Sequence, residues 1–332
     1  MNNNKEIDLL GIGNAITDIL VEVDYHFLQK MNLQIGAMQL ADYETINKTI
    51  KLFTDQKVSA GGSVANTISL TASLGNRCAF IGRRKNDFQG KLFSESMRAN
   101  SIMLPNDEVE IGNPSSTCLV MITPNGERTM LTYLGASTNL REEEIDLNLL
   151  EKSKVVYLEG YLFDLPEAKK LFYNLAEKQK EFSFELALSL SDPFCVKRHK
   201  EDFLKLLEKK IKIVFSNQEE LENLYNCGVE KALTKSSDKD LISVSTLGER
   251  GSLLNANGKL IKTEAIKVEV KDTTGAGDSF AAGFLHGYIH NLPLEKCSKI
   301  GNFCAAETVK IIGARPEVNM KELLLKNNIL EN

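Results

Sequence analysis

The stretch DTTGAGDSFAAGF, residues 272–284, lies between an alternating run at residues 266–270 and an apolar segment that predicts a helix over residues 279–289. Three small residues stand where the chain passes from loop to helix: Gly275, Ala276 and Gly277. Small side chains leave the backbone N–H groups unobstructed, and the start of a helix adds a partial positive charge. The stretch therefore predicts an anion-binding loop suited to a phosphoryl group.

Asp278 directly follows these small residues. A carboxylate would repel a phosphate that was only bound, but it is useful if it accepts a proton from a hydroxyl that attacks the phosphorus. Phosphoryl transfer depends mainly on positioning and charge stabilisation, so one base beside an anion site is close to sufficient. The alternative is that Asp278 caps the helix, as aspartates often do.

The rest of the chain alternates short apolar runs with helical segments, which predicts an α/β fold. We expect a doubly wound, mostly parallel central sheet with helices on both faces. The predicted strands are residues 7–12, 78–82, 155–158, 183–188, 211–215, 241–245 and 251–255, and the predicted helices are residues 63–74, 86–100, 166–180, 199–208 and 294–310.

Two segments, residues 18–40 and 115–134, break this rhythm and resemble strands joined by turns. The turn signal Pro-Asn-Gly at residues 124–126 predicts a hairpin. We expect a small separate β-sheet that covers a site as a lid. The predicted lid comprises residues 14–44 and 111–137, and the large domain comprises residues 1–13, 45–110 and 138–332.

Composition excludes several classes of protein. The net charge of −5 is spread along the chain, without the basic stripe that nucleic-acid binding requires. No apolar run reaches the roughly 18–20 residues that span a bilayer, and the N-terminal residues lack the apolar core of a signal peptide. We therefore expect a cytoplasmic protein whose six scattered cysteines stay reduced and serve as small buried side chains.

Two motifs carry a resemblance to a known family. Residues 272–284 resemble the C-terminal signature of the ribokinase (PfkB) carbohydrate kinases, and AGGSVANTISLTASLG, residues 60–75, resembles their N-terminal signature. The resemblance implies a ribokinase-like fold with a β lid. It also implies an ATP-dependent kinase that moves the γ-phosphate of MgATP to a hydroxymethyl group of a nucleoside or sugar, with Asp278 as the base.

The resemblance also implies that Asp18, Gly62 and Asn66 hold the acceptor hydroxyls, and we expect Asn14 and Gly61 beside them to bind the substrate too. A carboxylate such as Asp18 can accept two hydroxyl hydrogen bonds at once, although a solvated turn residue is the alternative. Arg128 in the hairpin would reach the phosphates when the lid closes, where a guanidinium spreads developing charge. The alternative for Arg128 is an exposed hairpin arginine.

On the nucleotide side, residues 217–220 resemble the family's NxxE motif and residues 246–251 its TxGxxG turn. The implied nucleotide-binding residues are Asn217, Thr246, Gly248, Gly251 and Asn302. Glu220 would hold Mg²⁺ through water, although an acidic helix start is the alternative. Asp272 and Thr274 resemble positions that bind a monovalent cation such as K⁺. The chain has no GxxxxGK[ST] motif, so a P-loop is excluded.

Four stretches are most similar to the adenosine-kinase branch: NAITDILVEVD at residues 14–24, YLEGYLF at 157–163, LALSLSDPF at 186–194 and GNFCAAETVKIIGARP at 301–316. This resemblance implies an apolar slot beside the ribose. Its expected lining is Met38, Leu40, Leu134, Ala136 and Leu162. Glu159 departs from the animal-type enzymes, which have a small residue there. Because a carboxylate favours a hydroxyl-rich ligand, a sugar kinase acting on fructose or ribose stays open.

Two other classes compete with a kinase. A non-catalytic regulator that binds a nucleoside or sugar would need the same pocket without turnover. An NAD-dependent dehydrogenase is disfavoured because GIGNAITD has Ile16 where a dinucleotide-binding fingerprint has its third glycine. We expect a small-molecule substrate, no nucleic-acid or membrane partner, and either a monomer or a homodimer.

Overall fold

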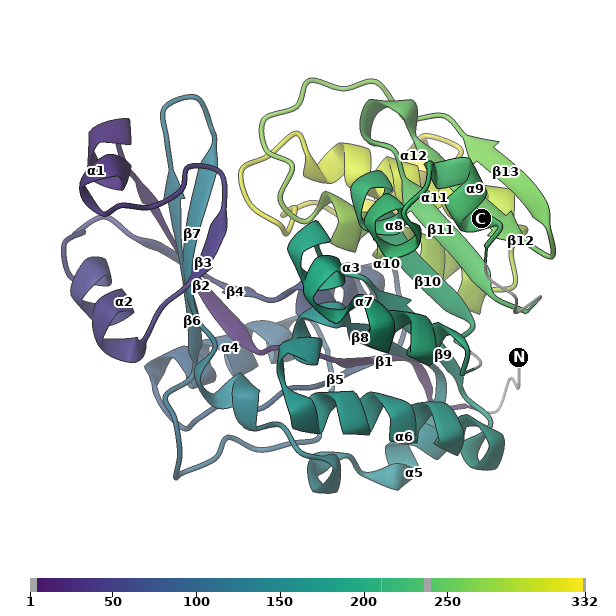
Figure 1. The fold of residues 1–332 in the computed structure, drawn as a ribbon, viewed down its shortest axis with the longest axis horizontal. Coiled ribbons are helices and arrows are strands. Elements are labelled where there is room, and N and C mark those ends of the chain that lie inside the picture. Colours follow the sequence, from purple (N-terminus) through teal and green to yellow (C-terminus); the bar gives the residue numbers. More distant parts are fainter. Residues whose placement is uncertain (1–4, 210, 236–239, 331–332) are drawn as a thin grey trace.

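An eight-stranded sheet forms the centre of the computed structural model, which describes residues 5–209, 211–235 and 240–330 (Figure 1). The strand order is β13-β12-β11-β10-β9-β8-β1-β5. The strands from β11 to β5 are parallel, while β12 and β13 are antiparallel to their neighbours. The bounds are β1 (Ile7–Ile12), β5 (Cys78–Ile81), β8 (Ser153–Glu159), β9 (Glu185–Ser189), β10 (Ile213–Asn217), β11 (Ile242–Thr246), β12 (Ser252–Ala256) and β13 (Lys259–Thr263).

Helices cover both faces of this sheet because its strands are apolar on both sides. In β1, Leu10 and Ile12 belong to one core while Leu9 belongs to the other. The first core also holds α5 (Leu147–Lys152), α6 (Pro166–Phe182), α7 (Pro193–Leu207), α8 (Gln218–Tyr225) and α9 (Val229–Leu233). The second holds α3 (Ser63–Ser73), α4 (Phe88–Ala99), α10 (Ala276–Ile289) and α11 (Leu294–Thr308), with α12 (Met320–Lys326) packed outside α3 and α11.

A second, five-stranded sheet stands beside the first, in the order β3-β7-β6-β2-β4 (Figure 1). We call this sheet and its two helices the lid. Its strands are β2 (Ile16–Glu22), β3 (Met38–Leu40), β4 (Lys57–Gly61), β6 (Ser116–Ile122) and β7 (Arg128–Tyr133), and its helices are α1 (Tyr25–Lys30) and α2 (Tyr43–Ile50).

The two faces of the lid sheet differ because side chains alternate along a strand. On one face, Ile19, Leu119 and Leu131 pack with Leu28 of α1 and Ile46 of α2 in a small core of their own. The other face, which carries every second residue, turns toward the large sheet. It therefore supplies side chains to the space between the two sheets.

The predicted fold class is confirmed: the main sheet is mostly parallel, helices flank it, and a second small sheet is present. Helices α1 and α2 were not predicted, because residues 18–40 were interpreted as strands and turns and no element was assigned to residues 43–50. The sequence assigned residues 45–110 to the large domain, whereas β4 at residues 57–61 hydrogen-bonds to β2 in the lid sheet.

One element boundary also differs from the prediction. The helix expected from residue 199 begins at Pro193, where the Asp192 side chain accepts a hydrogen bond from the Cys195 N–H and proline occupies the first turn. Among the described residues, none of the helices has the length and apolar character needed to cross a bilayer.

Candidate active site

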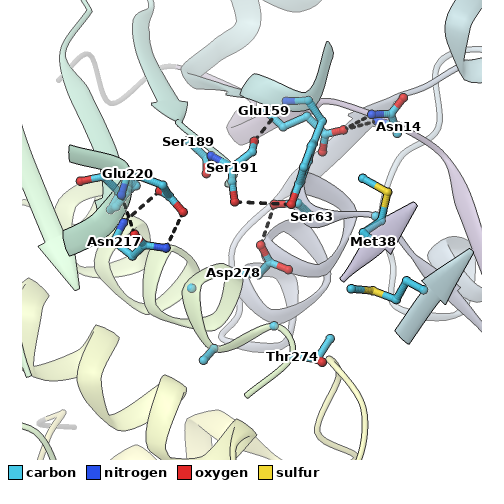
Figure 2. Close-up of a pocket in the computed structure, with 18 of the residues that line it drawn as sticks. Asn14, Met38, Ser63, Glu159, Ser189, Ser191, Asn217, Glu220, Thr274 and Asp278 are labelled. Carbon is cyan, nitrogen blue, oxygen red and sulfur yellow. Dashed lines mark hydrogen bonds between the residues drawn. The ribbon is translucent and has the colours of Figure 1, made fainter. Parts of the chain in front are cut away.

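A cavity of about 670 Å³ lies between the lid and the carboxyl ends of the parallel strands (Figure 2). Side chains that follow β1, β8, β9, β10 and β11 meet there, because the ends of parallel strands share one edge of the sheet. They are Asn14, Glu159, Tyr161, Ser189, Ser191, Asn217 and Thr246. The helix start at α10 and the inner face of the lid close the other sides.

Asp278 lies on the first turn of α10 and points into this cavity (Figure 2). Ser63 Oγ donates a hydrogen bond to one carboxylate oxygen at 2.6 Å, and Asn66 Nδ2 donates to the other at 3.0 Å. Burial raises the pKa of Asp278 to about 6, against the lowering by these donors and by Arg315. The position that caps α10 is Gly275, so Asp278 is not the helix cap that the alternative required.

The loop before Asp278 has the expected open backbone. Thr274, Gly275, Ala276 and Gly277 all line the cavity. Gly275 has a φ of +74°, and an added Cβ would lie 2.7 Å from the Cβ of Ala314, so only glycine fits there. A Cβ at Gly277 would meet nothing within 4 Å, which leaves room for a ligand over the start of α10.

Asp18 of β2 reaches the same cavity from the lid and packs over Gly61 of β4. A Cβ on Gly61 would lie 2.2 Å from an Asp18 carboxylate oxygen. Gly62 caps α3 with a φ of +95°, and a Cβ there would lie 2.3 Å from the Asn14 carbonyl oxygen. Burial raises the pKa of Asp18 to about 6, although Arg315 and Arg128 lower it. The two signature glycines thus let Asp18 and Asn14 approach the start of α3.

Glu159 lines the cavity but is fully buried, and both of its oxygens are occupied by protein groups. One accepts from the backbone N–H of Asn14 at 2.8 Å and from Asn14 Nδ2 at 2.5 Å, and the other accepts from the Val64 N–H at 3.0 Å. Burial raises the pKa of Glu159 to about 7, opposed by these three bonds. The carboxylate therefore ties Asn14 to the start of α3.

The expected apolar slot is present in part. Met38, Leu40 and Leu134 line the cavity from the inner face of the lid, together with Ile16 and Met130, which the sequence did not single out. Ala136 and Leu162, in contrast, are buried away from it. Leu162 belongs to the main hydrophobic core, because the turn after β8 points its side chain under α6 and α7.

Arg128 lies outside the main cavity in this conformation. Its guanidinium pairs with Asp272 and borders a second cavity of about 330 Å³, to which Asp18, Asn66 and Arg315 also contribute. The Asp272 carboxylate also accepts from the Thr274 N–H at 3.0 Å and from the Gly313 N–H at 2.8 Å. These contacts join the lid hairpin to residues 272–277, the predicted anion-binding loop, which we call the anion loop.

Asn217 and Glu220 line the cavity at the start of α8 and cap that helix reciprocally. Asn217 Oδ1 accepts from the Glu220 N–H at 2.8 Å, and Glu220 accepts from the Asn217 N–H at 2.9 Å. Thr246 and Gly248 also line the cavity. Gly251 and Asn302 do not line the cavity. The Asn302 side chain instead holds the end of β13, because its Nδ2 donates to the Thr263 and Glu264 carbonyl oxygens at 3.2 and 3.0 Å.

Comparison with known proteins identifies the family. Residues 29–320 match the pfkB family of carbohydrate kinases. The chain belongs to the PfkB family. Its fold overlays a probable sugar kinase from Rhizobium etli CFN 42 with a TM-score of 0.92, at 34% identity over 98% of this chain and 100% of the other.

The adenosine kinase from Sinorhizobium meliloti overlays with a TM-score of 0.90, at 36% identity over 97% of this chain and 99% of the other. The adenosine kinase of Dictyostelium discoideum is 27% identical over 93% of this chain and 96% of its own length. The predicted family and its adenosine-kinase-like branch are thus confirmed. The protein is a kinase that acts on a sugar or a nucleoside, and its family uses ATP with a divalent metal.

The cavity fits such a metal only sparsely. Among the described residues, no group of three or more His, Cys, Asp or Glu side chains could hold an ion. Glu220, the acid that the sequence singled out for this metal, is buried, and burial raises its pKa to about 7. Because Glu220 already accepts from Asn217, a divalent ion would rest mainly on phosphate oxygens and water, as Mg²⁺ commonly does.

Around Asp278, sequence reasoning missed Ser63 and Arg315. Ser63 follows the glycine pair 61–62, and its place on the first turn of α3 was the available signal. Arg315 donates from Nε to Asn66 Oδ1 at 2.8 Å, although the two residues are 249 positions apart. Nothing local in the sequence connects Arg315 to the site.

Proposed function

We propose that this kinase transfers the γ-phosphoryl group of MgATP to the primary hydroxyl of a nucleoside, with adenosine as the leading acceptor. The observation that carries the proposal is the carboxylate of Asp278, which points into the cavity beside an open glycine loop at a helix start. A base and an anion site in one place are what transfer to a hydroxyl needs.

Each part of the site has a step to perform. Asp18, Asn14 and the start of α3 hold the vicinal hydroxyls of the acceptor, which places its primary hydroxyl beside Asp278. Asp278 accepts the proton as the new oxygen–phosphorus bond forms and the bond to the leaving phosphate breaks. The amides of residues 275–277 stabilise charge on the transferring group, and a divalent ion bound with the nucleotide neutralises the phosphates.

The apolar inner face of the lid favours a nucleoside over a bare sugar. Met38, Leu40, Met130 and Leu134 form that face beside Asp18. A purine ring can bury its two faces against such side chains, whereas the hydroxyls of a free hexose would lose water without gaining partners. The similarity to the S. meliloti adenosine kinase supports the same choice.

A sugar such as fructose or ribose is the second candidate acceptor, supported by the similarity to the R. etli probable sugar kinase. The sequence argument for it was the carboxylate of Glu159. That carboxylate is occupied by Asn14 and Val64 and offers no free oxygen to a sugar hydroxyl. The structure therefore weakens the argument for a sugar.

An acceptor panel tests the proposal. Purified protein is assayed for ADP formation from MgATP with adenosine, inosine, guanosine, ribose, fructose and 2-keto-3-deoxygluconate. We expect the highest kcat/KM with adenosine. A higher kcat/KM with a free sugar would overturn the acceptor, and tight binding of adenosine without any turnover would favour a non-catalytic regulator.

A further inference from the structure

The loop between α11 and α12 places an arginine at the back of the active site. Arg315 Nε donates to Asn66 Oδ1 at 2.8 Å, and Asn66 Nδ2 donates to Asp278 Oδ2 at 3.0 Å. The loop is anchored at the anion site, since Gly313 N–H donates to Asp272 and Ala314 packs against Gly275. Arg315 thus has a fixed path to the carboxylate of Asp278 through one amide.

We propose that Arg315 is a positioning residue of the phosphoryl-transfer reaction, which turns the Asn66 amide toward Asp278 and supplies positive charge to both active-site aspartates. The inference rests on the proposed function of Asp278 as the base and Asp18 as the holder of the acceptor hydroxyls.

The orientation of Asn66 follows from the chemistry of its two neighbours. A guanidinium only donates hydrogen bonds, so it must face the amide oxygen. The amide nitrogen of Asn66 then faces Asp278 and donates to Oδ2, while Ser63 donates to Oδ1. With Arg315 absent, the Asn66 amide could rotate and present an oxygen to a carboxylate, which would repel it.

The charge of Arg315 acts on Asp278 and Asp18 together. Burial lowers the pKa of Arg315 to about 10, so the group stays charged at neutral pH, and both aspartates stabilise that charge. Arg128 of the lid also faces Asp18, and Asp278 in turn raises the pKa of Asp18.

Other groups face Asp278 without supplying a positive charge. Ser63 and Asn66 of α3 donate hydrogen bonds to it. Tyr157, Glu159 and Tyr161, at the end of β8, feel its charge. Arg315 is the cation that lowers the pKa of Asp278 against burial.

A purely structural arginine would satisfy its guanidinium with protein acceptors. Arg315 Nη1 instead lies 3.8 Å from the Met97 sulfur, and its buried Nη2 has no hydrogen-bond partner among the described residues. Within that part of the chain, Nε alone has an oxygen acceptor, which is the Asn66 amide that donates to Asp278. A buried donor without a hydrogen-bond partner lowers the stability of the fold. The positive charge that Arg315 supplies to Asp18 and Asp278 explains why such a donor is present.

The test compares the pH profiles of Arg315→Gln, Arg315→Lys and the control Arg98→Gln, which removes a half-exposed arginine of α4. The acceptor is whichever compound the wild type phosphorylates fastest. In the wild type, kcat should fall below about pH 6, because Asp278 acts as a base only when ionised.

Removing an opposite charge raises a carboxylate pKa by about one unit or more. In Arg315→Gln the fall of kcat at low pH should therefore move to higher pH, with kcat at pH 6 reduced about fivefold or more relative to the control. The KM for the acceptor should rise below pH 7 as Asp18 protonates, while the KM for ATP stays unchanged. Arg315→Lys should keep the acidic limb near that of the wild type but lower kcat, because an ammonium lacks the planar guanidinium geometry.

A folded Arg315→Gln variant with an unmoved acidic limb and unmoved acceptor KM would overturn the inference while leaving the kinase assignment intact. A wild type that phosphorylates none of the acceptors would instead remove the proposed function. If Arg315→Gln does not fold, Arg315→Lys decides: a lowered kcat with the wild-type acidic limb supports the role, and an unchanged kcat overturns it.

Discussion

The carboxylate of Asp278 accepts hydrogen bonds from a hydroxyl and an amide, both neutral donors, so the group remains basic enough to take a proton. Its pKa of about 6 lies below neutral pH, which keeps it ionised where a base is needed. Glu159 and Glu220 have higher pKa values, about 7, but their oxygens are occupied by backbone and amide donors. Among these acids, Asp278 combines ionisation with a place beside the anion loop.

Asp278→Asn should lower kcat by about 10²–10⁴-fold, because the amide preserves the shape of the side chain but cannot accept the proton. Binding of ATP, measured by calorimetry, should change little. The control is Asp55→Asn, at an exposed position between α2 and β4 that does not line the cavity. A variant that retains wild-type kcat would remove Asp278 as the base.

At the scale of single elements, the start of α3 is held by groups from three other segments. Gly62 caps the helix, Glu159 at the end of β8 accepts from its first turn, and Asp278 of α10 accepts from Ser63. Asn14, which follows β1, joins the same cluster through Glu159. The proposed acceptor site is therefore assembled on the helix start that carries the N-terminal signature.

Glu159→Gln should destabilise this cluster by about 1.5–3 kcal/mol, because an amide nitrogen would replace one oxygen and face an N–H donor. The free energy of unfolding can be measured by urea titration followed by circular dichroism. Glu143→Gln, at an exposed position of the short 3₁₀ helix Glu142–Glu144, is the matched control. Equal stability of the two variants would contradict a structural role for Glu159.

The lid hairpin is the second element with a consequence for activity. Arg128 of β7 pairs with Asp272, which anchors the hairpin to the anion loop. The same guanidinium is close enough to Asp18 to lower its pKa. We propose that on nucleotide binding Arg128 turns from Asp272 to the phosphates.

Arg128→Gln should lower kcat by about 10²-fold, a typical loss when one group that stabilises transition-state charge is removed. The KM for the acceptor should change less, since Asp18 keeps its contact with Gly61. Steady-state kinetics with saturating MgATP give both values. A variant with wild-type kcat would limit Arg128 to joining the lid to the loop.

At the scale of the whole molecule, the main cavity is made of two sheets that each have a core of their own. The large sheet supplies the strand ends and the anion loop, while the lid supplies Asp18 and the apolar face. A bound acceptor would contact both units and so would add a link to the packing of β2, β4 and β6 against α4. Ligand binding and lid closure should therefore be coupled.

Adenosine at a concentration of a hundred times its Kd should stabilise the fold by about 2.7 kcal/mol, if it binds only the folded state. Because the chain has no tryptophan, unfolding is best followed by circular dichroism. Inosine and ribose serve as matched comparisons that retain the ribose diol. Stabilisation by ribose equal to that by adenosine would show that the apolar face of the lid makes no contact with a base.

The sequence by itself determined the parts that depend on local pattern. Apolar runs with strand or helix periodicity predicted the mostly parallel sheet, since periodicity reports which faces of an element are buried. The small residues 275–277 before Asp278 predicted an anion loop with a base, because glycine conformation and helix polarity act over a few residues. The two signatures indicated the family that the comparisons confirm.

Only the tertiary structure decided which distant groups meet. Arg315 donates a hydrogen bond to Asn66, and Arg128 pairs with Asp272. Glu159 was expected to contact the acceptor, but its carboxylate accepts hydrogen bonds from Asn14 and from the start of α3. Leu162 and Ala136 became core residues for the same reason. Such contacts depend on strand order and on how loops close around a buried charge, and neither is recorded in the periodicity of a single segment.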